Sequence, residues 1–148
     1  MKRKHLILSA IFIAIIIIFS IGLYIYFKPQ KNFATSKSDY ILTSRQLFNE
    51  FEKNETESNK KYVTDDKTIQ ISGFVVEIGR DTDSTLNLII GESPNANGLV
   101  SCSFMKTENK NLENIKSNDK IFIKGQCTGF QGLIDKTVIM IRCAVVRE

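Results

Sequence analysis

The sequence predicts a mainly β protein: a small five-stranded Greek-key barrel, preceded by an amphipathic α-helix and by an N-terminal transmembrane helix. Three patterns in its 148 residues predict this. Residues 6–27 are almost entirely apolar, which is typical of a membrane span. Apolar residues in the segment 44–60 lie on one helical face, and from Thr68 onward apolar and polar residues alternate with the period of β-strands.

The apolar run from Leu6 to Phe27 is 22 residues long, enough to cross a hydrocarbon core of about 30 Å as a helix. The alternative is a cleaved signal peptide, whose apolar region usually has about 7 to 15 residues and ends at a small-residue cleavage site. The last four residues of this run include three aromatic ones, Tyr24, Tyr26 and Phe27, and Lys28 and Pro29 follow. Such an ending is typical of a helix that stops at a membrane interface, so we expect residues 6–27 to stay as an anchor.

Basic side chains flank both ends of this run, so the positive-inside rule gives only a slight orientation bias. A short tail before a single span usually stays in the cytoplasm, which makes residues 1–5 a cytoplasmic tail and places the domain outside the cytoplasm, in the cell envelope. Residues 28–42 are polar without an apolar period, and we expect them to form a mobile tether. Residues 43–148 then form the helix and the barrel.

The net charge of +4 belongs to the N-terminus and not to the domain. The first 37 residues hold six basic and no acidic side chains, whereas residues 38–148 hold fourteen basic and sixteen acidic ones, a net charge of −2. Nucleic-acid binders obtain much of their affinity by neutralising phosphates, so nucleic acid is a disfavoured partner.

Histidine is missing from the expected domain, because the single histidine, His5, precedes the predicted span. The domain therefore has no imidazole for general acid–base catalysis, for a Ser or Cys triad, or for a metal site that contains histidine. We expect a protein without catalytic activity and without a cofactor.

The segment Thr43-Ser44-Arg45-Gln46 fits a helix capping box, with Thr43 as the N-cap. It precedes three apolar residues, Leu47, Phe48 and Phe51, that share one helical face. We therefore expect a helix from about Ser44 to Lys60 that packs on a sheet.

Five strands are expected after this helix. Their ranges are 68–78, 86–90, 99–105, 120–127 and 137–146, with a short helix between residues 106 and 118. Three strands, a short helix and two strands is the order of an OB-fold, a small Greek-key barrel. A bulge is expected around Gly73, where the alternation shifts phase. In the last strand, Ile139, Ile141, Cys143 and Val145 are expected to share one face.

Several short motifs occur between Tyr62 and Val145: Ile71-Ser72-Gly73, Val100-Ser101-Cys102-Ser103-Phe104, and Gly125-x-Cys127-x-Gly129 with Cys143. On these motifs the chain resembles the bacterial tRNA-anticodon-binding-like (tRNA_anti-like) OB-fold domain family, over roughly residues 40–147. The resemblance implies the OB-fold but no established activity or catalytic residues. Asn118 stands where the family would have the glycine of a Gly-Asp turn, and Asn also tolerates the left-handed conformation.

The three cysteines lack C-x-x-C spacing, so a zinc site is not expected. If the last two strands form a hairpin that turns near Asp135, Cys127 and Cys143 lie symmetrically about the turn. In an oxidising compartment they could form a disulfide that contributes about 2 to 4 kcal/mol. The alternative is a pair of reduced, buried thiols that pack as small hydrophobes. In either case Cys102 is expected to be a buried free thiol.

Carboxylates occur in pairs at Asp65-Asp66 and at Asp81 and Asp83. Solvated turns explain both pairs, and neither continues into the D-x-D-x-D-G loop of an EF-hand. We therefore assign no metal.

OB-folds that bind single strands carry exposed aromatic residues on strands two and three, in a basic groove. Strand two has none, and Phe104 in strand three is expected to face inward. The nearest basic and aromatic face, and thus the candidate ligand-binding set, is Lys120, Phe122, Lys124 and Phe130. A solvated barrel wall explains these residues equally well.

The expected function is binding, through the barrel face and the loops at residues 80–84 and 91–98. The expected partners are the bilayer, through residues 6–27, and an unknown envelope protein, oligosaccharide or small ligand. Binding of single-stranded nucleic acid is the alternative.

Overall fold

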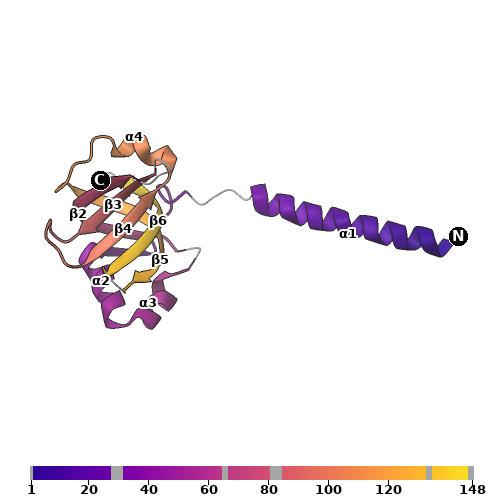
Figure 1. Ribbon diagram of the computed structural model, residues 1–148, viewed down its shortest axis with the longest axis horizontal. Helices are drawn as coiled ribbons and strands as arrows, with labels where there is room; N and C mark the ends of the chain where they lie inside the picture. Colours follow the sequence, from indigo (N-terminus) through magenta and orange to yellow (C-terminus); the bar gives the residue numbers. More distant parts are fainter. Residues whose placement is uncertain (1, 28–31, 65–66, 81–84, 133–134, 147–148) are drawn as a thin grey trace. The chain divides into compact units, whose positions relative to one another are not determined.

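The structure of the protein is a computed structural model that describes residues 2–27, 32–64, 67–80, 85–132 and 135–146 (Figure 1). The chain divides into two compact units, with the boundary between residues 31 and 32. The first unit contains helix α1 (Lys2–Phe27), so the predicted N-terminal helix is confirmed. Within the described part of the chain, no helix has both the length and the apolar character that crossing a membrane requires.

The second unit is a barrel with helices at both ends. Its elements are β1 (Tyr40–Thr43), α2 (Ser44–Lys53), α3 (Glu55–Tyr62), β2 (Ile69–Arg80), β3 (Leu86–Gly91), β4 (Leu99–Phe104), the 3-10 helix η1 (Lys106–Glu108), α4 (Asn109–Leu112), β5 (Lys120–Gln131) and β6 (Thr137–Val146). The strand order is β1-β2-β3-β4-β6-β5, and β5 also pairs with β2, which closes the barrel. Figure 1 shows α4 at one end and α2 with α3 at the other. The predicted OB-fold order is therefore confirmed.

The packed domain begins upstream of Thr43. Strand β1, which the sequence did not predict, pairs in parallel with the start of β2. Before it, the Asp39 carboxylate accepts a hydrogen bond of 2.7 Å from the backbone N–H of Thr68, and Phe33 is only 1% exposed. The structure thus places residues 32–42 in the domain instead of in the expected polar tether, whose residues 28–31 lie outside the described residues.

The predicted helix from Ser44 to Lys60 is two helices. The capping box of α2 is confirmed, because Thr43 and Gln46 each accept a hydrogen bond from the other's backbone N–H, at 3.1 and 2.9 Å. At Asn54 the backbone is extended (φ −155°), and its side chain accepts a hydrogen bond of 3.1 Å from the backbone N–H of Glu57. Asn is a weak helix former but a strong N-cap, so Asn54 ends α2 and begins α3.

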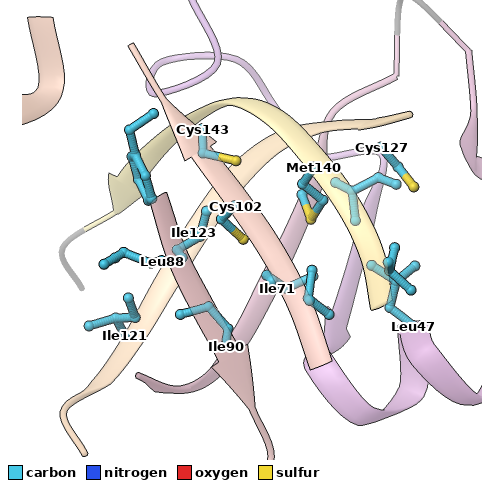
Figure 2. Packing of buried hydrophobic residues seen from close by; sticks show 14 of the residues in the cluster. Leu47, Ile71, Leu88, Ile90, Cys102, Ile121, Ile123, Cys127, Met140 and Cys143 are labelled. Carbon is cyan, nitrogen blue, oxygen red and sulfur yellow. The ribbon is translucent and has the colours of Figure 1, made fainter. Parts of the chain in front are cut away.

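The core fills the barrel with side chains from every barrel strand and from α2, and Figure 2 shows part of it. On β5, Ile121, Ile123 and Cys127 are all buried. On α2 the predicted apolar face is also buried. The turn before β5 is as expected, because Asn118 adopts the left-handed conformation with φ 74°.

The facing of β6 was predicted correctly only in its second half. Met140 is buried, whereas its neighbours Ile139 and Ile141 are half-buried on the other face. Arg142 has φ 52°, and the pairing of β6 with β4 shifts register beside it. This bulge inserts one extra residue, which returns Cys143 to the core and explains why strict alternation gave the wrong face for Ile139 and Ile141.

Candidate functional site

Two of the predicted ligand-binding residues, Lys120 and Phe122, lie together at the start of β5. The Lys120 ammonium is 5.9 Å from the centre of the Phe122 ring, a weak cation–π distance. The third, Lys124, is half-buried and donates a hydrogen bond of 3.1 Å to the backbone carbonyl of Ser36. Lys124 is therefore engaged by the segment that precedes β1, and it adds no free cation to a binding face.

The fourth predicted residue, Phe130, lies near the other end of β5. Eight residues of strand separate it from Phe122, which corresponds to about 26 Å. Its ring stacks on Phe51 at 5.9 Å and meets the edge of Phe48 at 5.8 Å. Phe130 thus helps to hold α2 on the barrel, and the four predicted residues do not form one site.

The outer surface of β3 and β4, which binds ligands in many OB-folds, carries small and aliphatic side chains. Ile89 pairs with Ser101, which pairs with Ile139 on β6, and all three are half-buried. Phe104 is 2% exposed, so its predicted inward position is confirmed. The described residues of these two strands therefore offer no aromatic ring on which a base could stack.

A groove of about 320 Å³ lies between α2 and the loop that follows β3. We call it the α2 groove. It is lined by Arg45, Phe48, Asn49, Glu52, Glu92, Ser93, Ala96, Asn97 and Gly98. Its volume is at the lower end of the range for small-molecule sites. The loop at residues 91–98, which the sequence predicts to contact a ligand, forms one of its walls.

Two of the residues that line the α2 groove, Gly98 and Phe48, are in close contact. A Cβ atom on Gly98 would lie 2.7 Å from Cδ1 of the Phe48 ring, so a larger residue would push the loop away from α2. Phe48 in turn packs against Phe130, which connects this side of the groove to β5.

Each charged side chain that lines the α2 groove has an ion-pair partner, which for Glu52 lies outside the lining. Arg45 forms an ion pair with Glu92, and Glu52 forms one of 2.7 Å with Lys136. The exposed carboxamides of Asn49 and Asn97 have no hydrogen-bond partner in the described part of the chain, and each offers a donor and an acceptor. This arrangement suits a polar ligand without net charge.

Beside the groove, α2 and α3 are joined by a cluster of three side chains. The Tyr62 hydroxyl and the Lys61 ammonium donate to the same carboxylate oxygen of Glu50, at 2.6 and 2.8 Å. Burial raises the pKa of Glu50, but the hydrogen bonds from Lys61 and Tyr62 outweigh it, so the pKa lies below its ordinary value of 4.5. Burial and then the bond to Glu50 raise the pKa of Tyr62. The cluster fastens one helix to the other.

The predicted pair Cys127 and Cys143 is not formed. Cys127 lies opposite Met140 in the β5–β6 ladder, and Cys102, Cys127 and Cys143 are all buried free thiols. Next to the turn, Gln131 already pairs with Thr137, two residues away from the register that symmetry about Asp135 requires. Burial raises the pKa of Cys127 to about 12, so this thiol stays protonated at neutral pH.

The carboxylate pairs Asp65-Asp66 and Asp81 with Asp83 lie outside the described residues, as does most of the loop at 80–84. Among the residues that are described, no group of three or more His, Cys, Asp or Glu side chains is placed to hold a metal ion.

Sequence reasoning missed Arg45 and Asn49 as groove residues. They lie on the polar side of α2, whose docking against the 91–98 loop depends on contacts distant in sequence. The turn residues of that loop, from Ser93 to Gly98, were the only local signal of a site in this region.

The tRNA_anti-like family model matches residues 1–145. Among solved structures, a lipoprotein from Klebsiella pneumoniae, whose name proposes that it binds nucleic acid, is 18% identical over 72% of this chain and 91% of that chain, with a TM-score of 0.56. A mitochondrial single-stranded DNA-binding protein from S. cerevisiae is 11% identical (57% and 99% covered, TM-score 0.39). The asparaginyl-tRNA synthetase from Entamoeba histolytica is 13% identical (55% and 21%, TM-score 0.40). No curated protein matches the chain.

Proposed function

The chain belongs to the tRNA_anti-like family, and we propose that it is a membrane-anchored OB-fold binding module without catalytic activity, whose domain lies outside the cytoplasm. The apolar run of residues 6–27, with its aromatic and basic ending, supports the anchor. The absence of histidine from residues 6–148 supports a role in binding and not in acid–base catalysis.

We place the ligand in the α2 groove and propose that it is an oligosaccharide. The observation that carries this proposal is the pairing of charges at the groove, Arg45 with Glu92 and Glu52 with Lys136, beside the unengaged carboxamides of Asn49 and Asn97. Sugar hydroxyls both donate and accept hydrogen bonds, as carboxamides do. OB-folds bind oligosaccharides as well as oligonucleotides, and a groove of about 320 Å³ admits a sugar unit but not the face of a folded protein.

Binding of single-stranded nucleic acid is the second candidate, because the name of the Klebsiella lipoprotein that shares this fold proposes nucleic-acid binding, and OB-folds often bind single strands. Two features of this chain weigh against it. Residues 38–148 have a net charge of −2, and the outward residues described on β3 and β4 include no aromatic ring. Both features oppose the phosphate neutralisation and base stacking on which such binding depends.

The test uses the full-length protein in detergent micelles. One arm is a microarray of neutral oligosaccharides, and the other is fluorescence anisotropy with a fluorescein-labelled single-stranded DNA of about 12 nucleotides, within the usual site size of an OB-fold. We expect saccharide binding that Asn97→Ala weakens by about tenfold, the loss of one good hydrogen bond. Asn95→Ala, in the same loop but outside the groove lining, is the matched control and should bind normally.

DNA binding that is saturable and weakens steeply between about 50 and 200 mM salt, together with no saccharide signal, would establish the second candidate instead. If the Asn97→Ala and Asn95→Ala variants bind the saccharide equally strongly, the ligand does not bind in the α2 groove.

A further inference from the structure

Two of the three thiols are neighbours in the barrel core. Cys102 on β4 and Cys143 on β6 are both fully buried, and burial and then the Cys102 thiol raise the pKa of Cys143. In Figure 2, Cys102 and Cys143 lie on the same side of Met140, and Cys127 lies on the other side. The neighbouring pair is therefore a different pair of cysteines from the one that sequence symmetry suggested.

The bulge in β6 brings these two residues to the same face of the sheet. Cys102 lies opposite Met140, and Phe104 lies opposite Cys143, so a step of two residues on β4 matches a step of three on β6. Without the extra residue, Cys143 would point to the outer surface, because side chains alternate along a strand. The left-handed conformation of Arg142 (φ 52°) turns the Cys143 side chain inward. Cys143 then lies opposite Phe104, two residues after Cys102 on β4.

We propose that Cys102 and Cys143 join in a disulfide when the chain folds in an oxidising compartment, and that Cys127 stays a free thiol. Formation in the cell rests on the proposed location outside the cytoplasm. The oxidant is a small-molecule or protein disulfide. One thiolate attacks it to give a mixed disulfide, and the second thiolate then displaces the remaining sulfur. The two cysteines lose two electrons and two protons, and the oxidant gains them as two thiols.

The packing around Cys143 determines when this reaction occurs. A Cβ atom on Gly125 would lie 2.8 Å from the Cys143 sulfur, so the folded barrel leaves no space beside this thiol for an oxidant. The bridge must therefore close while the barrel assembles. An oxidant added to the reduced, folded protein should leave all three thiols intact.

The test begins with full-length protein that is reduced, unfolded, and refolded in detergent with a glutathione redox buffer. The product is denatured without reductant, alkylated and mapped by mass spectrometry. We expect a linked pair of peptides that contain Cys102 and Cys143, lighter by two hydrogens than the free peptides, with Cys127 alkylated. Cys127→Ala, the matched control, should keep the link, and Cys102→Ala should abolish it. A link through Cys127, or three alkylated cysteines, would overturn the proposal.

The same map of protein from native membranes separates this proposal from the proposed location. A Cys102–Cys143 link in both preparations supports the pair and the oxidising location together. A link in the refolded protein but free thiols in native membranes supports the pair and contradicts the location. No link in either preparation overturns the pair, whatever the location.

Discussion

At the scale of single residues, Gly73 determines how closely α2 approaches the barrel. A Cβ atom there would lie 2.5 Å from Cγ2 of Ile90 and 2.8 Å from the Ser44 hydroxyl. We expect Gly73→Ala to lower the free energy of unfolding by about 2 kcal/mol, because this site has no space for an added methyl group. Urea unfolding of the full-length protein measures the change.

Gly79, six residues further along the same strand, is the matched control for Gly73. The nearest atom to a Cβ on Gly79 is 3.8 Å away, an ordinary van der Waals distance. Gly79→Ala should therefore change the stability by less than about 1 kcal/mol. Equal effects of the two substitutions would show that close packing at Gly73 is not the reason for its glycine.

The Glu50 cluster predicts a stability loss in acid. Because the folded pKa of Glu50 lies below its ordinary value of 4.5, its carboxylate stabilises the folded state above that pH, and the contribution is lost as the pH falls through the folded pKa. Glu50→Gln should lower the free energy of unfolding by about 1 kcal/mol at pH 7 and reduce the difference between pH 7 and acid. Urea unfolding across this pH range measures both effects.

Glu52→Gln is the control for the same substitution in the same helix. Among the described residues Glu52 pairs only with the exposed Lys136, and such surface pairs contribute little, so its loss should be within about 0.5 kcal/mol. If Glu50→Gln leaves the acid dependence of the free energy of unfolding unchanged, other carboxylates cause that dependence.

At the scale of elements, sequence patterns predicted what depends on neighbours in the chain. The capping box at Thr43 and the left-handed turn at Asn118 are local, and both are confirmed. The break at Asn54 is local too, but Asn suits both a helix surface and an N-cap, so composition did not distinguish them. Strand β1, and the choice of which β6 residues face the core, depend on backbone pairing between segments that are distant in sequence. The local alternation of apolar and polar residues carries no information about such pairing.

The segment before β1 tests this distinction, because sequence predicts a tether and the structure places it in the domain. Phe33 is 1% exposed, whereas Ile41, eight residues later, is 71% exposed. We expect Phe33→Ala to lower the free energy of unfolding by about 3 kcal/mol, as for other buried aromatic residues. Ile41→Ala should stay within about 0.5 kcal/mol. If urea unfolding shows that Phe33→Ala leaves the free energy of unfolding unchanged, this segment is a tether, as the sequence predicts, and not part of the packed domain.

At the scale of the whole molecule, sequence located the barrel but only one wall of the candidate site. The loop at residues 91–98 was predicted from its turn residues, and it does line the α2 groove. The four residues chosen on β5 lie on one strand but do not form one site, because a strand of this length spans the barrel from one end to the other. A site depends on which elements meet, and that information lies in tertiary contacts.

Orientation in the membrane is the last prediction, and the buried cysteines make it simple to measure. The three native thiols are fully buried, so a membrane-impermeant maleimide should not label the unaltered protein in intact cells. Ser117 is exposed, near the end of the barrel that carries α4. Because we place the domain outside the cytoplasm, Ser117→Cys should be labelled in intact cells, whereas Lys4→Cys, in the predicted cytoplasmic tail, should be labelled only after permeabilisation. The reverse pattern would place the barrel in the cytoplasm, where thiols stay reduced and nucleic acid becomes the first ligand to test.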